Sequence, residues 1–338
     1  MADSAGDEPG DEGGTAGGAA RDGARNEVGD EPRNGIGESR IGGTLVGGNE
    51  TGDVVLAVMC KAPSLGFSKT RLSPPLSADE AVELSRCFLT DVGALVGQVA
   101  DNAAARAAAV FTPAEDQDLL NGLLPADFAM LAQRGDDLGQ RCAAAVEDLL
   151  GLGFEAVCLL GADSPTLPAA YLHQAVALLR QPGERVVLGP ALDGGYYLIG
   201  VKRAHHGLFS DISWSTRRVL TQTVAQAEAL GLPIDWLPPW YDVDDALSLT
   251  WLVEELLGHG KPPVEGPLVA GAPVPGRPEP GDPGSAIAGL SEAAWPDAPI
   301  PALRLPSAAR TRTFLGKLLA RGEGPPPEPV GRRPDLGK

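Results

Sequence analysis

The sequence predicts an α/β fold, a mostly parallel β-sheet flanked by helices, in one domain over residues 53–260 with disordered tails on either side. Two observations lead to this prediction. Strand-like apolar runs alternate with helix-like patterns through the middle of the 338-residue chain. Much of its glycine and proline, 44 and 31 residues in all, lies in the flanking segments, where few apolar residues are available to form a core.

The expected elements follow from hydrophobic patterning. Residues 54–59 and 156–160 are continuous apolar runs, which is typical of strands buried on both faces of a sheet. Ser77 and Glu80 have the spacing of a capping box, and a helical pattern follows them to about residue 100. The other expected strands cover residues 107–112, 128–132, 186–188 and 196–199, and the other expected helices cover residues 116–123, 138–150, 169–179, 216–230 and 246–257.

The two tails differ from the middle in composition. Residues 1–52 are Gly-rich and acidic, and residues 261–338 are rich in Pro and Gly. Neither has a core-forming pattern, although residues 307–321 are compatible with one short basic helix. We expect both tails to be dispensable for folding of the middle domain.

Charge and cysteine usage limit the class of function. The formal net charge of -18 opposes binding to nucleic acid or to an anionic membrane, and no apolar run is long enough to span a bilayer. The start of the chain lacks the basic and apolar regions of a signal peptide. The four cysteines match no zinc module, so a cytoplasmic protein with reduced thiols is expected. Cys60 is more readily interpreted as a buried structural thiol than as a nucleophile.

A basic loop follows the first predicted strand. It contains Lys61, Gly66, Lys69 and Arg71 in an otherwise acidic protein. Lysine and arginine supply the donors that phosphate groups require, and glycine allows backbone N–H groups to approach a ligand. The loop lacks the spacing of a Walker motif, and a solvated basic loop is an equally good interpretation of the residues alone.

Three further acidic segments fall where parallel sheets bind ligands, beyond the carboxyl ends of strands. Asp163 follows the strand at 156–160 and can hold Mg²⁺ or cap the next helix. Asp193 lies in a D-G-G sequence, which favours a β-hairpin and also offers a ligand for a metal or a hydroxyl. Asp242 and Asp244 alternate along an extended segment and can converge on a divalent cation, with helix capping by Asp244 or Asp245 as the alternative.

A fifth segment opens the helix predicted at 138–150. It includes Asp137 and Gly139, and a helix N-terminus attracts anions. This segment can contact the base or sugar of a nucleotide. A polar loop with a helix cap explains the same residues.

Taken together and in order, these segments resemble a known family. The sequences KAPSLGFSKTRL, GDDLGQR, GADSPTL, GPALDGGYYLIG, WST and DVD are similar to those of bacterial GT-A-like transferases often labelled glycosyltransferases, some of them associated with arsenosugar biosynthesis. The resemblance covers about residues 54–257. It extends more distantly to 2-phospho-lactate guanylyltransferase and to the molybdenum-cofactor nucleotidyltransferases.

The resemblance implies a GT-A fold and a nucleotide donor held by Mg²⁺ or Mn²⁺. The chain departs from the nucleotidyltransferases in lacking their Gly-rich loop with an Arg-Met-Gly step. It also has Ala162 where many sugar transferases place the first carboxylate of a D-x-D pair. The positions that match family sites are Lys61, Lys69 and Arg71 for phosphate, Asp163, Asp242 and Asp244 for metal, and Asp193 on the acceptor side.

We therefore expect a metal-dependent enzyme that transfers a group from a nucleotide or nucleotide-sugar donor to a small-molecule acceptor. Lys69 and Arg71 would stabilise charge on the departing phosphate. The family label favours glycosyl transfer, and nucleotidyl transfer with release of pyrophosphate is the alternative. A non-catalytic nucleotide-binding module is a third possibility. Only an enzyme that uses a metal requires Asp163 and Asp244 to converge.

Overall fold

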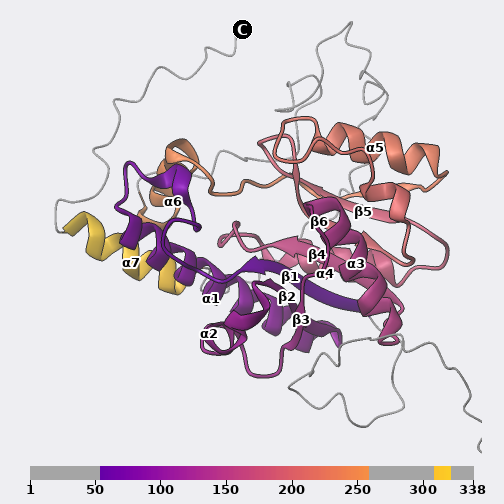
Figure 1. Cartoon of the computed structure of the whole chain (residues 1–338), viewed down its shortest axis with the longest axis horizontal. Coiled ribbons are helices and arrows are strands. Elements are labelled where there is room, and N and C mark those ends of the chain that lie inside the picture. Colours follow the sequence, from indigo (N-terminus) through magenta and orange to yellow (C-terminus); the bar gives the residue numbers. More distant parts are fainter. Residues whose placement is uncertain (1–53, 259–307, 321–338) are drawn as a thin grey trace, which may run out of the picture. The chain divides into compact units, whose positions relative to one another are not determined.

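The computed structural model describes residues 54–258 and 308–320 (Figure 1). The disorder expected for residues 1–52 concerns residues outside this range. Within it, seven strands form one sheet in the order β3-β2-β1-β4-β6-β5-β7. The strands are β1 (Val54–Lys61), β2 (Arg106–Thr112), β3 (Ala129–Ala132), β4 (Ala156–Gly161), β5 (Val186–Pro190), β6 (Tyr196–Val201) and β7 (Ile234–Trp236).

The predicted α/β class, with a mostly parallel sheet, is confirmed. Strands β1, β2, β3 and β4 pair in parallel, and β5 pairs in parallel with β7. Strand β6 is antiparallel to both of its neighbours because a tight hairpin connects it to β5. Strand β7 was not predicted from the sequence, since its three residues are too few to show a pattern.

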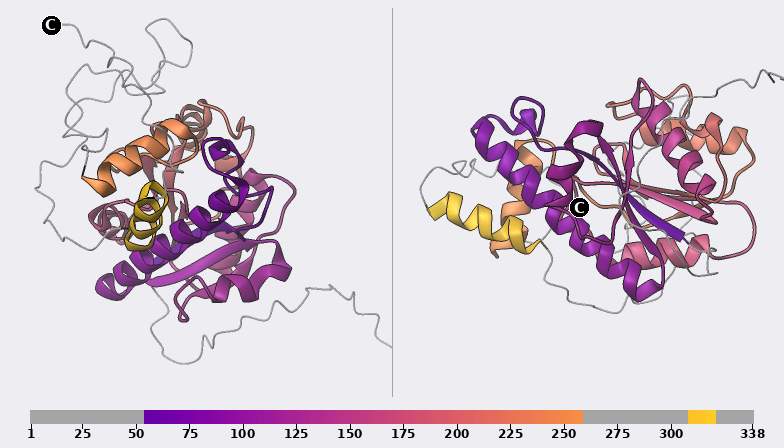
Figure 2. Two further views of the ribbon diagram at one scale, coloured as in Figure 1. Left: turned by 90° about the vertical axis from the view of Figure 1, so that its left-hand side faces the viewer. Right: turned by 60° about the horizontal axis from the view of Figure 1, so that its bottom comes forward.

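Helices cover both faces of the sheet (Figures 1 and 2). In β1, Leu56 and Val58 belong to a core that includes helices α1, α4, α6 and α7, whereas Val55 and Ala57 belong to a second core with α3 and α5. This alternation is the period of two expected of a strand. The helices are α1 (Ala78–Ala103), α2 (Gln117–Asn121), α3 (Leu138–Gly151), α4 (Ala169–Leu179), α5 (Val219–Ala229), α6 (Ala246–Leu257) and α7 (Ala309–Ala320).

The longest helix, α1, begins where the sequence predicts. The Ser77 side chain accepts a hydrogen bond from the Glu80 backbone N–H, and the Glu80 carboxylate accepts one from the Ser77 N–H. This capping box satisfies donors that the first helical turn otherwise leaves unpaired. It fixes the point at which the chain leaves the loop after β1 and enters α1.

The C-terminal helix α7, in the segment 261–338 that was expected to be dispensable, packs against the domain. Leu315 and Leu318 are buried, and α7 contacts α1 and α6. The Asp91 carboxylate, itself buried in α1, accepts hydrogen bonds from the backbone N–H groups of Arg310 and Thr311 at 3.0 and 2.8 Å. A side chain from another helix therefore caps the start of α7. The short helix expected within residues 307–321 is therefore present and docks on the domain, whereas its contribution to folding stays a prediction.

The loops that carry the candidate residues meet at one edge of the sheet. Strands β1, β4, β5 and β7 run in the same direction, so their carboxyl ends lie at the same edge of the sheet. Strand β1 is parallel to β4, β6 is antiparallel to both β4 and β5, and β5 is parallel to β7. The β5–β6 hairpin therefore lies at that edge together with the loops that follow β1, β4 and β7. No helix among the residues described is long and apolar enough to cross a membrane.

Candidate active site

A cavity of about 370 Å³ opens at this edge of the sheet. The loop after β1 contributes Lys61, Lys69 and Arg71 to its wall, the loop after β4 contributes Asp163, and the loop before α6 contributes Asp244. Five of the residues selected from the sequence thus line one cavity. Their position agrees with the rule that α/β sheets bind ligands beyond the carboxyl ends of their strands.

Lys69 lies at the centre of this arrangement. Its ammonium nitrogen is 2.8 Å from Asp163 Oδ1, 2.7 Å from Asp244 Oδ1 and 2.7 Å from the Val243 carbonyl oxygen. The side chain is only 9% exposed, although the sequence groups Lys69 with the exposed Lys61 and Arg71 as a phosphate ligand, and that role stays a prediction. Burial alone would lower the pKa of Lys69, but the charges of Asp163 and Asp244 outweigh it and raise that pKa above its ordinary value.

Asp163 and Asp244 come together around this nitrogen. Their Oδ1 atoms can be no farther apart than the sum of their two distances to Lys69 Nζ. The Val243 N–H also donates to the Asp163 carbonyl oxygen at 2.9 Å, which joins the two loops through the backbone. Neither Asp163 nor Asp244 is the N-cap residue of the helix that follows it. The N-cap residue of α4 is Pro168, which makes no side-chain capping hydrogen bond. The Asp245 side chain caps α6 by accepting from the Ser248 N–H, which leaves Asp244 available for the site.

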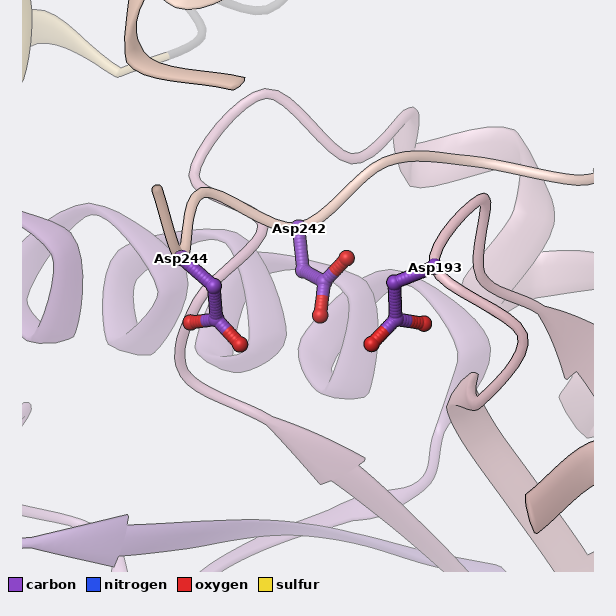
Figure 3. A group of neighbouring side chains, drawn as sticks. All are labelled: Asp193, Asp242 and Asp244. Atoms are coloured by element: carbon purple, nitrogen blue, oxygen red, sulfur yellow. The ribbon is translucent and has the colours of Figure 1, made fainter. Parts of the chain in front are cut away.

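Asp244 also belongs to a group of three neighbouring carboxylates. Carboxylate oxygens of Asp193, Asp242 and Asp244 lie within 4.8 Å of one another. Figure 3 shows the three side chains pointing to the same side, with Asp242 between the other two. Burial, and then the charges of Asp193 and Asp244, raise the pKa of Asp242 to about 7. Three carboxylate ligands at this spacing match the oxygen donors that Mg²⁺, Mn²⁺ and Ca²⁺ prefer.

The Asp193 loop is a hairpin and is also part of this acidic group. The Asp193 carboxylate accepts a hydrogen bond from the Gly195 N–H at 2.8 Å, which closes the turn between β5 and β6. Gly194 has φ +94°, and a Cβ atom there would lie 2.5 Å from the Arg217 carbonyl oxygen. Only glycine fits this backbone, so the paired glycines fix the direction in which Asp193 points.

The basic loop places its residues in different environments. Lys61 and Arg71 are exposed and line the cavity, whereas Gly66 does not line it. Gly66 has φ +76°, and nothing lies within 4 Å of the position that a Cβ atom would take. Glycine at this position is explained by the backbone turn rather than by the approach of another group.

Asp137 and Gly139 lie apart from the other candidates. They line a second cavity, of about 550 Å³, together with Arg134 and Trp214. The Asp137 carboxylate caps α3 by accepting from the Gln140 N–H, as the structural interpretation of this segment expected. A Cβ atom on Gly139 would lie 2.6 Å from the Phe209 carbonyl oxygen and 2.8 Å from Trp214 Nε1. Packing therefore explains this glycine, and the segment is not brought into the first cavity.

Several residues of the first cavity were not selected from the sequence. Ser85 and Leu89 lie four residues apart in α1, one helical turn, and Phe67 and Ser215 come from loops. Ser215 has φ +61°, a conformation that non-glycine residues rarely adopt and that is common at functional sites. It belongs to the WST sequence, one of the segments in which the chain resembles the family. Trp214 of the same sequence lines the second cavity, so two consecutive residues line different cavities.

Cys60 is a structural thiol. Its side chain is buried in the core, and burial together with the charge of Asp163 raises its pKa to about 12. A thiol with so high a pKa is protonated at neutral pH and is a poor nucleophile. All four cysteines are free and buried.

Residues 95–216 match the family described as "Uncharacterized protein conserved in bacteria (DUF2064)". No curated protein matches the chain. A crystal structure of a "putative nucleotide-diphospho-sugar transferase" from Desulfovibrio desulfuricans G20 is 30% identical, with a TM-score of 0.53, and the match covers 59% of this chain and 85% of that chain.

Two more distant structures were also found. The 4-diphosphocytidyl-2C-methyl-D-erythritol synthase of Anaerococcus prevotii DSM 20548 is 8% identical, with a TM-score of 0.42, over 62% of this chain and all of that chain (100%). The inositol-1-phosphate CTP transferase of T. maritima is 16% identical, with a TM-score of 0.38, over 62% of this chain and 98% of that chain. Given its 30% identity over most of the D. desulfuricans protein, the chain belongs to the same GT-A-like transferase family as that protein.

Proposed function

We propose that this protein transfers a group from a nucleotide-activated donor to a small-molecule acceptor and that it uses Mg²⁺ or Mn²⁺. One observation carries the proposal: carboxylates from the loops after β4, β5 and β7 converge beside a cavity that also contains Lys61 and Arg71. Acidic residues next to basic ones in one cavity suit a ligand that combines a cation with phosphate groups.

The proposed metal ligands are Asp163, Asp242 and Asp244, with Asp193 beside Asp242. The donor set fits the metal, because all four residues offer the hard oxygen atoms that Mg²⁺ and Mn²⁺ prefer. A divalent cation at such a site neutralises the phosphate oxygens of a donor and so stabilises the leaving group. Asp193, which the sequence offers as a ligand for a metal or a hydroxyl, has its carboxylate next to that of Asp242.

The proposed donor site extends over both cavities. Lys61 and Arg71 would bind the phosphates, and Arg71 offers the planar set of donors that can hold two oxygens at once. The second cavity, with Asp137 and Gly139 in its wall, would hold the nucleoside, since Trp214 in its wall directly precedes Ser215, which lines the first cavity. Asp193 would orient the hydroxyl group of the acceptor, because it is the most exposed of the three clustered carboxylates.

A sugar is the proposed transferred group. The description of the D. desulfuricans relative as a nucleotide-diphospho-sugar transferase supports this choice. In sugar transfer, the acceptor attacks the anomeric carbon and a nucleoside diphosphate leaves. In the alternative, nucleotidyl transfer, the acceptor attacks the α-phosphorus and pyrophosphate leaves.

The products distinguish the two reactions. The protein is incubated with Mn²⁺ and a panel of nucleotide sugars, and separately with nucleoside triphosphates and sugar phosphates. Sugar transfer, or hydrolysis of the donor in the absence of an acceptor, releases a nucleoside diphosphate. Release of pyrophosphate would support nucleotidyl transfer instead. If no donor in either panel binds or reacts, with or without Mn²⁺, the proposal of group transfer is wrong.

A further inference from the structure

We propose that Lys69 is an internal counter-ion for the Asp163–Asp244 pair and that a divalent cation displaces it, which frees its ammonium group for the phosphates of the donor. The inference rests on the proposed function, because it concerns the same metal and the same donor. Lys69 would occupy two positions in turn, first between the two carboxylates and then, once the cation is bound, facing the donor phosphates.

The hydrogen bonds of Lys69 lead to this inference. An ammonium group has three hydrogens, and the nitrogen of Lys69 has three acceptors at 2.7–2.8 Å: Asp163, Asp244 and the Val243 carbonyl. No hydrogen is left for a phosphate oxygen. A Lys69 that binds phosphate and an Asp163–Asp244 pair that binds a metal are therefore compatible only if the lysine moves.

The balance of charge favours an incoming cation. Asp193, Asp242 and Asp244 lie within 4.8 Å of one another, and Asp163 shares Lys69 with Asp244. The ammonium of Lys69 thus contacts two members of a group of four neighbouring carboxyl groups. A divalent cation that bridges Asp163 and Asp244 would supply twice the charge of Lys69 at the same oxygens, and repulsion would oppose the presence of both cations.

The cavity beside Lys69 offers space for its ammonium group. Its side chain already lines the 370 Å³ cavity, next to Lys61 and Arg71. Its backbone has φ +49° and ψ +38°, a left-handed conformation that costs a non-glycine residue free energy and that its surroundings must hold in place. The ion pairs with Asp163 and Asp244 are part of what holds it. Once a cation takes those oxygens, rotation of the side chain brings the ammonium into the cavity.

The displacement of Lys69 by a cation is tested by measuring the affinity for Mn²⁺ of the wild-type protein and of two variants. Electron paramagnetic resonance gives the concentration of unbound Mn²⁺. Lys69→Met removes the competing ammonium, so we expect Mn²⁺ to bind about tenfold more tightly. Lys61→Met is the matched control, because Lys61 lines the same cavity but is exposed. It should change the affinity by less than about threefold. Equal effects of the two substitutions, or weaker binding by Lys69→Met, would overturn the inference.

A measurement on the wild-type protein decides the matter if Lys69→Met does not fold. Lysine ammonium groups that are buried and hydrogen-bonded give ¹⁵N-detected signals protected from exchange with water, and Lys69→Arg identifies the one from Lys69. Saturating Mg²⁺ should abolish that signal as the ammonium leaves its carboxylate partners. A signal that persists unchanged would overturn the inference. If the wild-type protein binds neither Mn²⁺ nor Mg²⁺, the proposed function fails, whereas normal metal binding with an immobile Lys69 contradicts the exchange alone.

Discussion

At the scale of single residues, the site depends on how two kinds of side chain are placed. Lys61 and Arg71 are exposed at the cavity, whereas Lys69 is buried between carboxylates. The sequence shows three basic residues in one loop and gives no means of telling them apart. The difference arises from Asp163 and Asp244, which are distant in sequence and reach Lys69 only in the folded chain.

The exposed pair is expected to supply most of the affinity for phosphate in the metal-free protein. Replacing Lys61 and Arg71 together by Ala removes charge-assisted hydrogen bonds worth about 1.5–3 kcal/mol each. Isothermal titration calorimetry with a nucleoside diphosphate should therefore show binding at least tenfold weaker. Arg106→Ala is the control, because Arg106 is exposed at the opposite end of the parallel strands. Unchanged affinity in the double variant would remove the basic loop from the donor site.

Gly194 tests the packing that directs Asp193. In Gly194→Ala, the new Cβ atom would meet the Arg217 backbone at 2.5 Å, and φ of +94° is strained for alanine. We expect a loss of about 2–3 kcal/mol in the free energy of unfolding, measured with urea. Gly231→Ala is the matched control: it has φ +67° and open space, so it carries the backbone strain without the clash and should lose about 1 kcal/mol. Equal losses would show that the hairpin yields to a side chain at Gly194.

At the scale of elements, much of the fold follows from local pattern. The strands at β1 and β4 are apolar because both faces of the sheet are covered, and the capping box at Ser77 fixes the start of α1. The hairpin at Asp193 follows from its Asp-Gly sequence. Strand β7 and the docking of α7 were missed, because both depend on contacts between distant parts of the chain.

The docking of α7 is expected to contribute measurably to stability. Asp91→Ala removes the carboxylate that accepts from the Arg310 and Thr311 N–H groups and leaves those donors unpaired at a buried helix end. We expect a loss of about 1–3 kcal/mol in the free energy of unfolding. Asp101→Ala is the control, because Asp101 lies on the same helix and is exposed. A loss no larger than that of the control would restore the expectation that the C-terminal tail is dispensable.

At the scale of the whole molecule, the sheet accounts for the site. Four loops that are separate in sequence meet at one edge because the strands before them end there. The sequence predicts this meeting for Asp163, which follows a predicted strand, and for Asp242 and Asp244, which alternate along an extended segment and match the metal site of the family. It also grouped Asp137 and Gly139 with them, whereas the structure places these two residues at a neighbouring cavity, where Asp137 caps α3 and Trp214 packs against Gly139.

The dependence of nucleotide binding on a divalent cation tests the central claim most directly. Calorimetric titrations with a nucleoside diphosphate are compared in Mn²⁺ and in EDTA, for the wild-type protein, for Asp242→Asn and for Asp101→Asn. We expect Mn²⁺ to strengthen binding by at least tenfold in the wild-type protein and in the Asp101→Asn control, and to have almost no effect in Asp242→Asn, which lacks the central carboxylate of the acidic group. Binding that is the same in Mn²⁺ and EDTA, or an Asp242→Asn variant that responds like the wild-type protein, would contradict a metal-dependent donor site at this edge of the sheet.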